Sequence, residues 1–166
     1  NERDKRIGQR VHALVAAFLR DGEVPEPRRV WVAAGQLFAA SPLPQNQGAR
    51  QRAACAVGAY FSVFHRPAWG FVGAEVDLGT GRVDLVWRTP SGAVVIDEVK
   101  MAGHADMVDD PATVAQVARY VEAGQHHFGK EFAGVRLLPL AAPGRALWCP
   151  QNGQRCALVD AGDEVA

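Results

Sequence analysis

Two acidic residues and a lysine occupy positions from which they could act together. Asp84 lies inside the apolar run 82–88, and Glu98 and Lys100 lie at the end of the apolar run 93–100. Side chains alternate along a strand, so Glu98 and Lys100 share one face. Carboxylates that converge in apolar surroundings repel each other and favour a bound cation. The pattern indicates a Mg²⁺ or Mn²⁺ site at which a bound water could attack a phosphodiester.

A hairpin would bring these three groups together. Residues 89–92 are Thr-Pro-Ser-Gly, which is typical of a turn, so the two runs should pair antiparallel. Glu98 and Lys100 would then face Asp84, and the lysine could orient or deprotonate water or stabilise the transition state. An alternative is a salt bridge at the rim of the sheet, because Glu-X-Lys alone is a common pattern.

Four short elements follow one another along the chain. The first two are Asp84 and, after thirteen intervening residues, the group 98–100 (Glu-Val-Lys). The other two are segment 8–12 (Gly-Gln-Arg-Val-His), upstream of them, and segment 116–120 (Gln-Val-Ala-Arg-Tyr), downstream. The first two resemble the signature of the PD-(D/E)XK nuclease superfamily. The other two resemble the Gly-X-X-X-His and Gln-X-X-X-Tyr motifs of its RecB-like branch, and all four stand in the family's order.

The resemblance implies a fold, an activity and a set of roles. The fold would be α/β, a three-layer α/β/α restriction-endonuclease-like core with a central mixed β-sheet flanked by helices. The activity would be that of a Mg²⁺- or Mn²⁺-dependent deoxyribonuclease, a hydrolase of phosphodiester bonds. The implied metal ligands are His12, Asp84, Glu98 and the carbonyl of Val99, with Lys100 positioning the nucleophile and Gln116 and Tyr120 supporting the site.

His12 lies beside the apolar stripe of a helix predicted over residues 3–20. A single histidine in this position is also typical of a hydrogen-bonded residue at the boundary of the core. As a ligand it would favour Mn²⁺ over Mg²⁺, because imidazole suits the softer ion.

Gln116 and Tyr120 are four residues apart on a helix predicted from Pro111 to about Phe128, so they share a face. The alternative is that Tyr120 belongs to the core and Gln116 to its boundary. Glu75 lies on a strand predicted over residues 69–78, either as an outer carboxylate near the metal or as a solvated strand residue.

One nuclease-like domain is predicted to span residues 1–166, since 166 residues with 48% hydrophobic content can bury a full core. The chain begins at Asn1 rather than Met, which suggests a trimmed chain or a domain of a larger parent protein. Within the domain we expect a helical region (residues 1–66) with helices near 30–40 and 49–65. A catalytic sheet and helix (residues 67–142) with a later strand at 133–140 should follow, and then a tail (residues 143–166).

The charge pattern bears on the partner. The formal net charge is zero, but arginines outnumber lysines fifteen to three and gather in the N-terminal half, while Asp106, Asp109, Asp110 and the C-terminal tail are acidic. Arginine-rich surfaces contact phosphates, so DNA is the expected partner, with single strands or ends favoured by the resemblance and with modest, salt-sensitive affinity. A high-GC genome would enrich arginine equally well.

Three cysteines, at positions 55, 149 and 156, are too few for a disulfide framework and for the four-cysteine iron-sulfur cluster of some RecB-like relatives. We therefore expect no disulfide framework and no cluster, and we interpret residues 149–156 as a turn between two short strands. No segment has the length of a membrane span or the pattern of a signal peptide, so a cytoplasmic location is expected.

Two other functions remain open. The chain could be a catalytically silent nucleic-acid-binding module of the same fold, or a nuclease activated by a protein partner. The sequence does not distinguish DNA from RNA, exonuclease from endonuclease action, or repair and recombination from anti-phage defence, and it leaves the oligomeric state open.

Overall fold

The computed structural model describes residues 2–40, 47–101, 110–154 and 156–159. The chain divides into two compact units, residues 1–65 and 66–166, and each is described by itself. The single domain predicted over residues 1–166 stays a prediction. Asp106, Asp109 and the acidic tail, which the charge argument included, lie outside the described residues.

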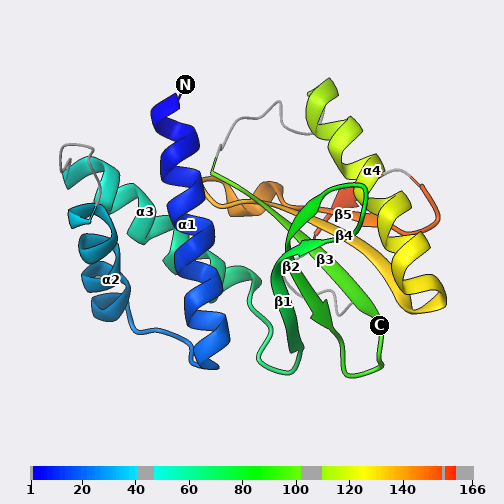
Figure 1. Ribbon diagram of the computed structural model, residues 1–166, viewed down its shortest axis with the longest axis horizontal. Coiled ribbons are helices and arrows are strands. Elements are labelled where there is room, and N and C mark those ends of the chain that lie inside the picture. The colour runs from blue at the N-terminus through cyan, green and yellow to red at the C-terminus, as the bar shows by residue number, and fades with distance from the viewer. Residues whose placement is uncertain (1, 41–46, 102–109, 155, 160–166) are drawn as a thin grey trace. The chain divides into compact units, whose positions relative to one another are not determined.

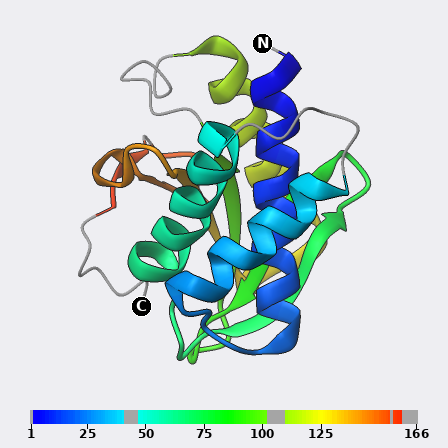
Figure 2. The ribbon, with the colours of Figure 1, turned by 90° about the vertical axis from the view of Figure 1, so that its left-hand side faces the viewer.

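The N-terminal unit is helical (Figure 2). Phe18 packs edge-to-face against Phe61, with the ring centroids 6.1 Å apart, and so joins the buried face of the first helix to the last turn of the unit. The stripe predicted from the helical spacing is confirmed, because Val11 and Val15 are buried. The elements are α1 (Glu2–Asp21), α2 (Pro27–Ala39), α3 (Gln47–Ala59) and the π-helical turn η1 (Tyr60–Phe64).

An arginine on α3 packs against α2 of this unit, beside a glycine of α2. The Arg50 guanidinium stacks 3.9 Å from the centre of the Trp31 ring and donates hydrogen bonds to the Trp31 carbonyl at 2.7 and 3.1 Å. A Cβ at Gly35 would lie 2.5 Å from this guanidinium, so a larger residue there would displace the arginine from its position over Trp31. Some of the arginine content is therefore structural.

The C-terminal unit is a mixed six-stranded sheet in the order β1-β2-β3-β4-β5-β6 (Figure 1). Neighbouring strands are antiparallel except β3 and β4, which are parallel and are connected through the helix α4. The strands are β1 (Gly70–Asp77), β2 (Arg82–Arg88), β3 (Val94–Lys100), β4 (Phe132–Pro139), β5 (Leu147–Pro150) and β6 (Ala157–Leu158). The helical elements are α4 (Pro111–Phe128), η3 (Gly129–Glu131) and η4 (Pro143–Arg145). The hairpin of β2 and β3 predicted from the sequence is confirmed.

Local chemistry sets the start of α4 and its position on the sheet. The carboxylate of Asp110 accepts hydrogen bonds from the backbone N–H and the hydroxyl of Thr113, both at 2.8 Å, and Pro111 opens the first turn. These hydrogen bonds lower the pKa of Asp110 below its usual value. Close packing at the other end requires Gly124, since a Cβ there would lie 2.4 Å from the Phe132 ring. Residues of α4 and the sheet share one hydrophobic cluster.

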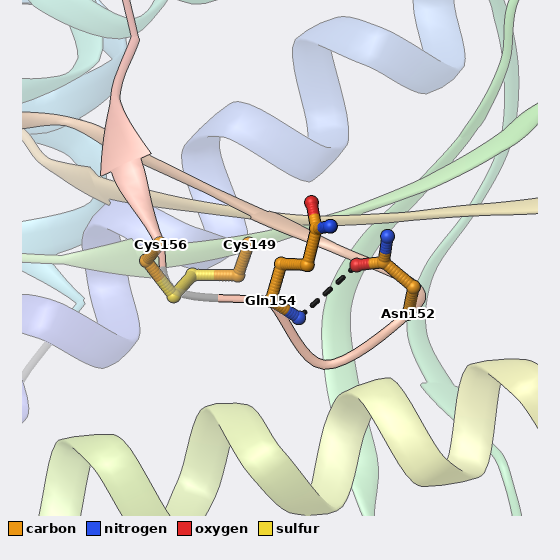
Figure 3. Close-up of a disulfide and its surroundings, with 4 residues drawn as sticks. All are labelled: Cys149, Asn152, Gln154 and Cys156. Atoms are coloured by element: carbon orange, nitrogen blue, oxygen red, sulfur yellow. Dashed lines mark hydrogen bonds between the residues drawn. A yellow bond between two sulfur atoms is a disulfide. The ribbon is translucent and has the colours of Figure 1, made fainter.

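The sequence reasoning expected no disulfide framework and did not predict the single disulfide that the structure contains. Cys149 on β5 is bonded to Cys156 beside β6, with their Cα atoms 4.3 Å apart (Figure 3). Trp148 pairs with Ala157 across the hairpin, so the next residues along each strand, Cys149 and Cys156, face each other. The number of residues between the two cysteines does not by itself reveal this strand register. The predicted turn between two short strands is confirmed, and its backbone is held by the Gln154 N–H, which donates to the Asn152 side chain at 3.0 Å. No helix in the described ranges is long and apolar enough to cross a membrane.

Candidate active site and metal centre

Strand register places three carboxylates side by side across the first three strands. Glu75 on β1, Asp84 on β2 and Glu98 on β3 occupy neighbouring positions of the same row. Carboxylates aligned in this way repel one another, so the row favours a compensating positive charge. The pairs that fix the alignment are Ala74 with Leu85 and Leu85 with Asp97, each one residue away from the row.

Glu75 and Asp84 are two like charges that lie close together. Oxygen atoms of their two carboxylates lie within 4.8 Å of each other. Glu75 also has a φ of 51°, an unfavourable backbone conformation for a residue with a side chain. Arg82 offers partial compensation, with its Nη1 4.0 Å from Glu75, but both side chains are about half exposed. A site that combines backbone strain with adjacent carboxylates is typical of function rather than of stability.

Asp84 is fixed in place by the neighbouring strand. Its Oδ2 accepts a hydrogen bond of 2.7 Å from the backbone N–H of Val99. A charge-assisted bond of this kind holds the carboxylate close to β3, beside Glu98. The sequence predicted that these two acids converge, and the register agrees.

Lys100 forms the centre of a polar group that is mostly withdrawn from water. Its Nζ lies 2.6 Å from Oε1 of Glu98 and 2.6 Å from the side-chain oxygen of Gln116 on α4. The Glu98 residue is only 3% exposed, so this ion pair lies in low-dielectric surroundings. The two residues form a salt bridge, in which Glu98 is buried and Lys100 is partly exposed. Whether the lysine also acts in catalysis stays a prediction.

The chain of hydrogen bonds continues along α4. The Gln116 amide N–H donates to the Tyr120 hydroxyl at 2.9 Å, and that hydroxyl donates to the Arg82 carbonyl at 3.0 Å. Tyr120 is 8% exposed and also belongs to the hydrophobic cluster, so its core interpretation is confirmed, and its support of the site stays a prediction. Gln116 and Tyr120 lie on one face of α4, as the four-residue spacing predicted. Through their hydrogen bonds this face connects Lys100 on β3 with β2.

Burial raises the pKa of the Tyr120 hydroxyl above its usual value, and the carboxylate of Glu98 raises it further. In the unfolded chain the tyrosine hydroxyl loses its proton near pH 10.0, whereas in the folded protein its pKa is higher. The stabilisation is therefore present below pH 10.0 and is lost as the pH rises through the folded pKa. We expect the difference in unfolding free energy between wild type and Tyr120→Phe to fall above pH 10, measured by urea titration. A constant difference from pH 8 to 11 would contradict this.

His12 lies on α1 of the N-terminal unit, where it is partly buried. That unit is described by itself, so the geometry of the carboxylate row rests on the C-terminal unit alone. Ligation by His12 stays a prediction.

One buried group was missed by the sequence reasoning. Asp97 and Arg136 face each other on β3 and β4 and are 0% and 2% exposed. Each is a charge in the middle of an apolar strand, and such residues are almost never buried unless paired. This rule could have identified the pair from the sequence. The sequence reasoning passed over Asp97 because the adjacent Glu98 and Lys100 match a nuclease motif and Asp97 does not.

The donor set at the carboxylate row fits a hard divalent cation. It offers the oxygens of Glu75, Asp84 and Glu98 and contains no sulfur ligand. Mg²⁺ and Mn²⁺ prefer such carboxylate oxygens together with water. The crowded pair of Glu75 and Asp84 is the feature that such an ion would relieve.

A mixed sheet packed against α4, with a carboxylate row followed by a lysine, is consistent with an α/β protein of the restriction-endonuclease-like class. The model of the PD-(D/E)XK nuclease superfamily matches residues 1–158, and the chain belongs to that superfamily. The resemblance seen in the sequence is confirmed at this level. None of the curated proteins matches the chain.

Two solved structures are similar over a portion of the chain. One is an EndoMS complex with double-stranded DNA, with 26% identity over 44% of this chain and 28% of that one, and a TM-score of 0.36. The other is a repair endonuclease from Pyrococcus abyssi, with 20% identity over 60% of this chain and 40% of that one, and a TM-score of 0.40. The chain thus covers less than half the length of either protein.

Proposed function

We propose that this chain hydrolyses DNA phosphodiester bonds as a Mg²⁺- or Mn²⁺-dependent deoxyribonuclease of the RecB-like branch. The observation that carries the proposal is the aligned row of Glu75, Asp84 and Glu98 with Lys100 bonded to its buried end. Membership of the nuclease superfamily supports it.

The residues take distinct roles in this proposal. Asp84, Glu98 and the Val99 carbonyl hold the metal, and His12 completes its coordination. When bound, the ion acidifies a water molecule and offsets negative charge on the phosphate. Lys100 lies within 2.6 Å of Glu98, so its ammonium group can orient that water or donate to a phosphate oxygen.

α4 supports this lysine. The Gln116 side-chain oxygen accepts a hydrogen bond from Lys100, and Tyr120 holds the other end of the Gln116 amide. The two residues thereby restrict the lysine to the side of the sheet that carries Glu98. A fixed donor of this kind needs no reorganisation when charge develops on the phosphate.

Glu75 acts as an outer carboxylate in this proposal. Glu75→Gln should raise the Mn²⁺ concentration for half-maximal cleavage by about tenfold, as the loss of a supporting group does in other metal sites. Cleavage at saturating Mn²⁺ should change less. A suitable control is Asp77→Asn on the same exposed strand, since asparagine keeps an oxygen to accept from the Gly79 N–H. Equal metal dependence in both variants would exclude Glu75 from the site.

The proposal is tested with labelled single-stranded, linear double-stranded and circular DNA, each with Mn²⁺, Mg²⁺ or EDTA. Metal-dependent cutting of single strands or linear ends, with circular duplex spared, is the expected result. Cutting that persists in EDTA would contradict the metal mechanism. DNA binding without cutting under any condition would instead favour a silent or partner-activated module. DNA repair, recombination and anti-phage defence are all compatible with the expected activity, as is a cytoplasmic location.

A further inference from the structure

The buried pair of Asp97 and Arg136 joins two strands on the face of the sheet opposite the site. The guanidinium Nε lies 2.6 Å from Oδ1 of Asp97, and a second guanidinium nitrogen lies 2.7 Å from Oδ2. Two parallel bonds of this kind fix both the distance and the angle between donor and acceptor. The parallel contact between β3 and β4 is therefore pinned at one residue pair.

Two tryptophans extend the pair. The indole N–H of Trp87 on β2 donates to Oδ2 of Asp97 at 3.0 Å, and the Trp69 ring lies 4.7 Å from the Arg136 guanidinium carbon. Asp97 thus binds β2 and β4 at the same time. The fully buried charges have well-aligned partners, which is the condition under which such a pair is tolerated.

The position of this group along β3 relates it to the proposed chemistry. Asp97 immediately precedes Glu98, and successive strand residues point to opposite faces. Any slip or tilt of β3 at Asp97 therefore moves the Glu98 carboxylate. A buried ion pair often adds little to stability compared with an apolar replacement, so its use here calls for another explanation.

We propose that Trp87, Asp97 and Arg136 form a positioning cluster, which holds β3 in place so that Glu98 lies beside Asp84 and Lys100. The inference rests on the proposed function, because it concerns the metal and nucleophile groups of that site. The cluster lies on the other face of the sheet from the carboxylate row, so it acts through the backbone of β3.

The test replaces the whole cluster with apolar side chains of similar size, as Trp87→Phe/Asp97→Leu/Arg136→Met. Because the donor and both charges are removed together, no buried member of the cluster is left without its partner. Folding is followed by circular dichroism and thermal unfolding. Mn²⁺ affinity is measured by calorimetry without DNA, and kcat and KM are measured by DNA cleavage.

We expect a folded protein whose Mn²⁺ affinity falls by about tenfold, a loss typical of residues that orient metal ligands. The kcat should fall at least as far, while KM for DNA changes little. Wild-type Mn²⁺ affinity and kcat in a folded triple variant would overturn the inference. Arg88→Met is the control, since it breaks an exposed pair between β2 and Glu131 of η3 and should alter neither value.

Two further measurements separate the different failures. If the triple variant does not fold, Arg136→Lys keeps the charge but loses the two-bond geometry, and it should show a smaller fall in Mn²⁺ affinity. Unchanged affinity in that variant would overturn the inference. If wild type binds Mn²⁺ but cuts no DNA, the proposed function fails while the calorimetric comparison still tests the positioning cluster.

Discussion

Lys100→Ala should lower metal-dependent DNA cleavage by about 10²- to 10⁴-fold, the usual contribution of a positioned acid–base group. The ammonium group is held between Glu98 and Gln116 at 2.6 Å from each, and an alanine methyl group can neither donate a proton nor carry this charge. The measurement is the single-turnover rate at saturating Mn²⁺. This separates the loss of chemistry from any weakening of metal or DNA binding.

The control for this variant must account for folding, because removing the lysine leaves Glu98 buried without its cation. Lys130→Ala removes an exposed lysine from η3 and should keep full activity. Lys100→Arg keeps the charge and should retain the fold while losing much of the rate, since a guanidinium is a planar donor rather than a compact one. Full cleavage by a folded Lys100→Ala protein would remove this residue from the mechanism.

Arg136→Met should lower the free energy of unfolding by about 3–5 kcal/mol, the usual cost of removing one partner from a buried ion pair. The substitution takes two charge-assisted hydrogen bonds from the Asp97 carboxylate, which is 0% exposed and keeps the neutral Trp87 indole as a donor. Urea unfolding followed by circular dichroism measures the change. The same experiment on Arg88→Met should show about 0–1 kcal/mol, because that ion pair is exposed.

A loss below about 1 kcal/mol for Arg136→Met would show that solvent reaches the Asp97 carboxylate once the guanidinium is gone, since surface pairs contribute no more than this. Arg136→Met also differs from the triple apolar variant in a useful way. The single change leaves the Asp97 carboxylate buried without its guanidinium and should destabilise the folded protein. The triple change removes both charges together and should not. The contrast separates stability from the positioning of Glu98.

The local elements and most of the candidate site could be predicted from the sequence. Alternating apolar residues and a Thr-Pro-Ser-Gly turn predicted the hairpin of β2 and β3, and Pro111 predicted the start of α4. These signals depend on neighbouring residues, so no long-range knowledge is needed. Because strand faces alternate and helix faces recur every four residues, the grouping of Glu98 with Lys100 and of Gln116 with Tyr120 also followed.

The facing of distant residues, in contrast, came from the strand registers of the folded chain. The register between β1 and β2 set Glu75 opposite Asp84, and the register between β5 and β6 brought Cys149 to Cys156. The parallel register between β3 and β4 likewise joined Asp97 to Arg136, 39 positions along the chain. A shift of one residue in any strand would turn each of these side chains to the other face. Local sequence sets the alternation of faces, but pairing between strands depends on packing across the whole sheet.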